Sequence, residues 1–247
     1  MDPDTALQLL LLGVVLPFVA SLVTTAACWW SARGILPSNA RPDARRALVA
    51  AILCPLAVLV GVQWLLFGSL SFPPRHALHL IPLLLIGAAV LGRSPIRSTA
   101  DVIAVIGIVR LAAAETAQQT AIAMVFVLWG GAMMMLTPCA RPVRSWTLFV
   151  PLGFTLAGAA VALVTTGSLK LAQLAGASAV TLLGVFLVSL ARPRLTIAGP
   201  ALSVFVAMLA ATLAQGASFG DTPRWLAYVI GLGGPALAAG LVRWRGR

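Results

Sequence analysis

Charged residues are scarce in this chain. They make up 9% of its 247 residues, whereas 60% are hydrophobic, and the longest polar gap runs only from Ser31 to Arg46. A soluble domain of this size needs a far more polar surface, so the composition excludes one. A helix needs about 20 apolar residues to cross roughly 30 Å of hydrocarbon. The sequence therefore predicts an all-α polytopic membrane protein with a single membrane domain over residues 1–247.

Acidic residues are scarcer still. There are 6 of them against 17 basic residues, which gives a net charge of +11. In a soluble protein such an excess would suggest nucleic-acid binding. In a membrane protein, basic loop residues set the orientation and meet anionic lipid headgroups. We expect those headgroups at the cytoplasmic face as partners, and no nucleic acid.

Several catalytic motifs are missing. The chain has no GxxxxGK[ST] phosphate-binding loop, no HExxH zinc motif and no GxSxG with a credible base nearby. No predicted span carries paired histidines for haem or a lysine near its middle. We therefore predict no catalytic residue, no cofactor and no metal, and we expect that the chain is not an enzyme.

The three cysteines do not suggest a site. Cys28, Cys54 and Cys139 fall at or near the side predicted to be cytoplasmic, where thiols stay reduced. Their spacing suits neither a disulfide framework nor a metal cluster. We interpret them as ordinary small apolar residues.

Nine apolar stretches are candidate spans. They cover residues 7–30, 47–70, 77–92, 99–115, 118–136, 146–166, 171–191, 195–216 and 225–242. The stretch from Thr99 to Leu136 is too long for one ordinary crossing and slightly short for two, and the loop charges decide between them. If this stretch crosses twice, the loops on one side of the membrane hold thirteen arginines and those on the other side hold three basic residues. If it crosses once, the loops on each side hold eight basic residues. Because cytoplasmic loops carry the excess of basic residues, we predict nine spans, with the amino terminus outside and the carboxyl terminus in the cytoplasm. We expect a bacterial inner membrane.

Short tripeptides recur about 100 residues apart. Ala40-Arg41-Pro42 returns as Ala140-Arg141-Pro142, and Gly68-Ser69-Leu70 returns as Gly167-Ser168-Leu169. The shared order and offset suggest a first span (1–38) followed by two four-helix repeat units (39–138 and 139–247). Four crossings per unit is an even number, so the two copies would be parallel repeats.

One polar cluster falls at the tip between the fourth and fifth spans. It consists of Arg110, Glu115, Gln118 and Gln119. Ionisable groups inside spans are costly and mark candidate sites. Arg110 could contact an anionic group, Glu115 could accept protons or cations, and the glutamines could donate hydrogen bonds. The structural alternative is a snorkelling arginine beside a solvated turn glutamate.

A second outer cluster consists of Arg75, His76 and His79 at the start of the third span. The two histidines stand three residues apart, so on a helix they could face one partner. A zinc site normally takes at least three protein ligands, so we interpret these residues as interfacial ones at a helix start.

Three functions fit this architecture. The first is a permease-like protein that binds or moves a small solute or ion between the two repeat units. The second is a non-catalytic subunit of a larger membrane complex, in which short loops and abundant small residues would serve packing against partners. The third is an intramembrane enzyme acting on a lipid-linked substrate, which requires His76, His79 and Glu115 to converge within about 3 Å or one bridging water.

Overall fold

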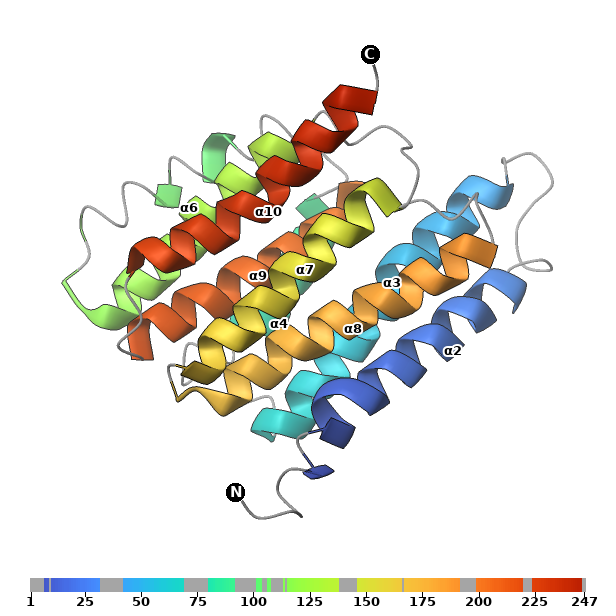
Figure 1. Cartoon of the computed structure of the whole chain (residues 1–247), viewed down its shortest axis with the longest axis horizontal. Helices are drawn as coiled ribbons and strands as arrows, with labels where there is room; N and C mark the ends of the chain where they lie inside the picture. Colours follow the sequence, from blue (N-terminus) through green and yellow to red (C-terminus); the bar gives the residue numbers. More distant parts are fainter. Residues whose placement is uncertain are drawn as a thin grey trace.

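The structure is a computed structural model of the whole chain. It describes residues 7–8, 10–31, 42–68, 80–91, 101–103, 106–107, 113, 115–137, 146–165, 167–191, 199–219 and 224–245. Every element within these ranges is helical. The elements are η1 (Leu11–Val15), α2 (Leu16–Ser31), α3 (Pro42–Phe67), α4 (Leu80–Leu91), α6 (Ala117–Leu136), α7 (Trp146–Thr165), α8 (Leu169–Ala191), α9 (Gly199–Phe219) and α10 (Arg224–Arg245). The all-α bundle is thus confirmed (Figure 1).

Four helices are long and apolar enough to cross a membrane. They cover Leu11–Trp30, Gln119–Leu136, Thr147–Thr165 and Leu169–Ala191, and Leu53–Phe67 and Leu202–Gly216 form shorter apolar helices. This fits a helical membrane protein. Eight of the nine predicted segments coincide with described helices, because each uninterrupted apolar run can satisfy its backbone only within a helix in lipid. Most of the ninth segment, 99–115, lies outside the described residues.

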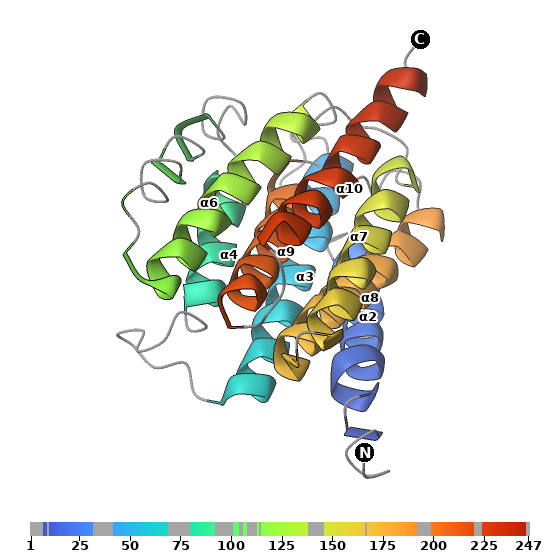
Figure 2. The same cartoon turned by 60° about the vertical axis from the view of Figure 1, so that its left-hand side comes forward.

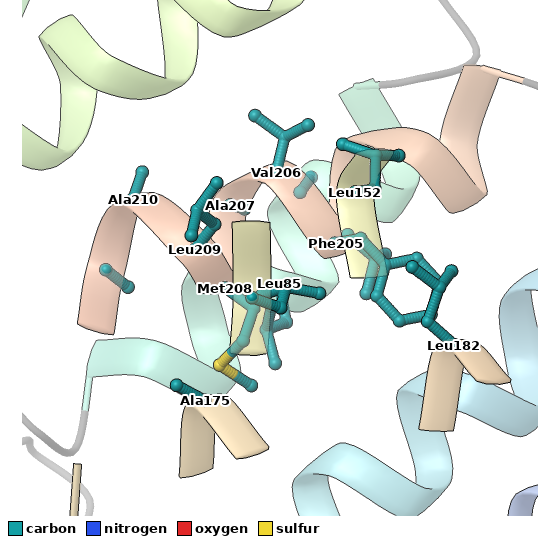
Figure 3. Close-up of a cluster of buried hydrophobic side chains, with 14 of the residues drawn as sticks. Leu85, Leu152, Ala175, Leu182, Phe205, Val206, Ala207, Met208, Leu209 and Ala210 are labelled. Atoms are coloured by element: carbon teal, nitrogen blue, oxygen red, sulfur yellow. The ribbon is translucent and has the colours of Figure 1, made fainter. Parts of the chain in front are cut away.

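Helix α9 lies at the centre of the bundle. Every residue from Leu202 to Gly216 is buried, so this stretch has no exposed face. It contacts α3, α4, α6, α7, α8 and α10, and Figure 2 shows these helices around it. In Figure 3, Phe205 lies beside Leu182 of α8, and Met208 reaches towards Leu85 of α4. A helix that is apolar all round is suited to this central place.

Helices α2 and α8 pack closely and run in the same direction. Gly13, in η1 just before α2, lies against Gln173 of α8, and further along both helices Ser21 lies against Gly184. The Ser21 hydroxyl donates a hydrogen bond of 2.8 Å to the carbonyl oxygen of Thr181. Small residues at such positions let two backbones approach within a membrane.

Other contacts fix further helix directions. Leu128 of α6 lies against Gly231 of α10, and Gly131 lies against Leu232. Figure 1 shows that α6 and α10 also run in the same direction. The Nζ atom of Lys170, at the start of α8, lies 5.8 Å from the ring centre of Phe67 at the end of α3. These two helices therefore run in opposite directions.

The bundle begins with a turn of π-helix. The N–H of Leu16 donates to the carbonyl of Leu11, five residues back, and Pro17 follows directly. A proline ring clashes with the carbonyl four residues earlier in a regular α-helix. A wider turn just before Pro17 makes room for that ring. Pro55, Pro151 and Pro235 lie inside α3, α7 and α10.

Candidate functional site

Only part of the predicted polar cluster falls within the described residues. Arg110, Arg75, His76 and His79 lie outside them, as does the side chain of Gln118. Glu115 and Gln119 are exposed at the start of α6. The predicted roles of these residues in binding, and the convergence of His76, His79 and Glu115, stay predictions.

Gln119 takes part in a cap at the start of α6. Its backbone N–H donates to Thr116 Oγ1 at 3.2 Å, and its side-chain Oε1 accepts from the backbone N–H of Glu115 at 2.8 Å. Thr116 is extended, with φ −117° and ψ 155°, as an N-cap residue should be. This arrangement resembles a capping box, whose sequence signal is a threonine followed three residues later by glutamine. The cap occupies the Oε1 acceptor of Gln119, so the predicted donation to a solute would have to come from its Nε2–H group.

The described residues line an open pocket of about 310 Å³ between α4, α6 and α9. It is lined by Ile81, Leu83, Leu84, Gly87, Ile122, Val125, Phe126, Trp129, Ala211 and Gln215. The residues from α4 and α6 belong to the first of the two proposed repeat units and those from α9 to the second. The pocket therefore lies between segments of the two proposed repeat units, where the sequence analysis expected the solute site.

The pocket lies towards one end of the bundle. The lining residues of α4 and α6 come mostly from the amino-terminal halves of these helices, and those of α9 come from its carboxyl-terminal half. Ile122 follows the capping residue Gln119 by three positions, about 4.5 Å along the helix axis. The near edge of the pocket thus lies on the side of the bundle where Glu115 is exposed.

Two polar side chains line this otherwise apolar pocket. Trp129 and Gln215 are only 4% and 3% exposed. Among the described residues, neither the Trp129 Nε1–H nor the Gln215 Oε1 has a hydrogen-bond partner. A buried polar atom without a partner costs about 1–3 kcal/mol, so native proteins hold few of them. One is a donor and the other an acceptor, and both atoms are themselves buried, so a hydroxyl or amide on a bound molecule could satisfy both only once the Trp129 and Gln215 side chains turn towards the cavity.

The described lining of the pocket is apolar except for Trp129 and Gln215. None of the described residues that line it is ionisable. Within the described part of the chain, no three histidine, cysteine, aspartate or glutamate side chains lie together where they could hold a metal ion. The sequence interpretation missed this site because an apolar lining looks the same as lipid-facing surface in the sequence.

Comparisons with known proteins add no relative from which a function could be transferred. No protein-family model matches the chain, and no curated protein or solved structure is significantly similar to it.

Proposed function

We propose that this chain is a nine-span, permease-like membrane protein that binds a small and largely apolar solute in the pocket between α4, α6 and α9. The observation that carries the proposal is a pocket of about 310 Å³ beside the central helix, with an indole N–H and an amide oxygen that lack partners among the residues that the structure describes. Ligand sites are typically concave and apolar, with a few placed polar groups, and this volume lies at the small end of their range. The solute would therefore be a small molecule with one polar group.

The directions of the helices support nine crossings, and the loop charges support an amino terminus outside. Helices α4 and α6 both present their amino-terminal halves to the pocket, as two crossings between Thr99 and Leu136 require. The parallel pairs α2 with α8 and α6 with α10 fit the same alternation. Together with the excess of basic residues on one side, this alternation would place the pocket in the outer half of the membrane.

A charged part of the solute, or a coupling ion, would meet the polar end of α6. Glu115 is exposed there and could accept a proton or a cation. Arg110 is proposed to contact an anionic group. If Glu115→Gln and Arg110→Ala proteins fold normally and keep full activity in a cellular assay, this part of the proposal is wrong.

The test of the pocket is a binding experiment on the purified full chain in detergent. The probes are 2-naphthol, which donates and accepts a hydrogen bond, 2-methoxynaphthalene, which only accepts one, and naphthalene, which does neither. We expect 2-naphthol to raise the melting temperature most. Gly87→Leu fills the pocket, because a Cβ on Gly87 meets no atom within 4 Å, and should abolish the effect.

Gly153→Leu is the matched control. Gly153 also has open space around it, but it lies in a different hollow, between α7 and α8. This variant should keep the response to 2-naphthol. Equal responses of the two variants, or no response of the wild type to any probe, would show that the pocket is not the binding site.

A second candidate function is a non-catalytic subunit of a larger membrane complex. It is favoured by an apolar hollow of about 320 Å³ on α7 and α8, where Phe154 is 76% exposed beside the small residues Gly153 and Ala157. A partner helix could pack there through such small residues. Purification from native membranes in mild detergent tests this function. A protein that co-purifies in stoichiometric amounts, and that is lost in the Phe154→Ala and Ala157→Leu variants, would favour the complex subunit.

A further inference from the structure

Two cysteines that stand far apart in the sequence meet between α2 and α3. The Sγ atoms of Cys28 and Cys54 are 2.9 Å apart. Both are free thiols, and the Cys54 thiol also lies 3.4 Å from the carbonyl oxygen of Thr24. We propose that Cys28 and Cys54 are an oxidative modification site, at which a peroxide converts the two thiols into a reversible disulfide that joins α2 to α3.

The geometry requires little movement. A disulfide bond is about 2.05 Å long, so the two sulfur atoms need to approach by roughly 0.9 Å. Helices α2 and α3 already pack against each other, so rotation about the two side-chain bonds supplies most of this distance. Two cysteines whose side chains pointed apart could not be bridged without moving the backbone, and here the thiols face each other.

The two thiols differ in access. Cys28 is half-buried, whereas Cys54 is 4% exposed. Cys28 is therefore the thiol that a small oxidant reaches first. Its sulfur attacks one oxygen of hydrogen peroxide, the O–O bond breaks, and a sulfenic acid and one water form. The Cys54 sulfur then attacks the Cys28 sulfur, the S–O bond breaks, and a second water leaves. Two thiols and one peroxide thus give one disulfide and two waters.

The disulfide would act on a helix at the edge of the bundle. The candidate span formed by η1 and α2 is the least buried of the four. In Figure 1, α2 lies at the margin of the bundle, beside α8. A covalent link to α3 would fasten this outer helix without closing the pocket between α4, α6 and α9. The proposal is therefore independent of the proposed function.

The experiment uses the full chain, purified in detergent in the reduced state. The protein is treated with a small excess of hydrogen peroxide, the remaining thiols are alkylated with N-ethylmaleimide, and the intact mass is measured. The chain holds three cysteines. We expect one alkylated thiol after oxidation instead of three, a peptide that links Cys28 to Cys54, a higher melting temperature, and full reversal by dithiothreitol.

Cys139→Ser is the matched control. It should still form the disulfide, with two alkylated thiols before oxidation and none after, whereas Cys28→Ser and Cys54→Ser should form no intramolecular link. The linked peptide from the wild type keeps the test valid even if Cys54→Ser fails to fold. The proposal is overturned if all three thiols can still be alkylated after a peroxide treatment that is strong enough to oxidise free glutathione. A mass increase by oxygen atoms alone, a link to Cys139, or a disulfide between two chains would also overturn it.

Discussion

Replacing Gly184 by alanine should loosen the contact between α2 and α8. A Cβ at this position would lie 2.9 Å from Ser21 Oγ, 3.0 Å from Ser21 Cβ and 3.1 Å from the backbone nitrogen of Leu22. Uncharged contacts between carbon atoms are most favourable at about 3.5–4.0 Å. The Ser21 hydroxyl cannot simply turn away, because it donates to Thr181 O at 2.8 Å. The backbone of α2 must therefore move by roughly 0.5 Å, since contacts near 3 Å have to lengthen to the ordinary range.

The expected loss is about 2 kcal/mol of unfolding free energy. Overpacking of a well-packed contact typically costs about 1–3 kcal/mol. A stretched hydrogen bond between transmembrane helices adds roughly 0.6 kcal/mol. Alanine is the better helix former, which returns about 0.5–1 kcal/mol. The matched change is Gly176→Ala on the same helix, where the new Cβ meets nothing closer than 3.9 Å, so this variant should be neutral or slightly stabilised.

The assay is thermal or denaturant-induced unfolding of the full chain in detergent. Gly184→Ala should unfold at a lower temperature than the wild type and Gly176→Ala should not. The double variant Ser21→Gly with Gly184→Ala should recover part of the loss, because it removes two of the three close atoms. If Gly184→Ala is as stable as Gly176→Ala, the close approach of α2 and α8 is wrong.

Two further predictions concern the start of α6 and the orientation of the chain. Thr116→Ala should lower the unfolding free energy by about 1 kcal/mol, because Thr116 Oγ1 caps the helix. Glu115→Gln should not lower it, because Glu115 joins the cap only through its backbone N–H. Equal stability of the two variants would argue against the cap. In a cysteine-free chain, Glu115→Cys should react with an impermeant maleimide added to spheroplasts and Arg243→Cys should not, and the reverse result would contradict the predicted orientation.

The start of α6 illustrates a local signal that was present in the sequence. Thr116 and Gln119 stand at capping-box spacing, and the structure gives Gln119 a capping hydrogen bond. Sequence reasoning assigned Gln119 to a solute because it lies beside Arg110 and Glu115. A polar side chain near a helix end can serve either purpose, and only its hydrogen bonds distinguish them.

The cysteines illustrate a long-range contact that the sequence could not give. Cys28 and Cys54 are separated by 26 positions, and their spacing fits no disulfide framework. Their contact depends on how far α2 is shifted along α3 and on the rotation of each helix about its axis. Both quantities are set by packing, through contacts such as those of Gly13 and Ser21 with α8.

The sequence by itself determined that the described part of the chain is helical and where eight of its helical segments lie. An apolar run in lipid can satisfy its backbone groups only by forming a helix, so length and hydropathy are sufficient for that purpose. Only the tertiary structure decided that α9 is the central helix and that Trp129 and Gln215 line one pocket. The physical reason is that side chains facing lipid and side chains facing the core are equally apolar. The periodic pattern that marks a buried face in a soluble helix is therefore weak here, and packing alone selects the neighbours.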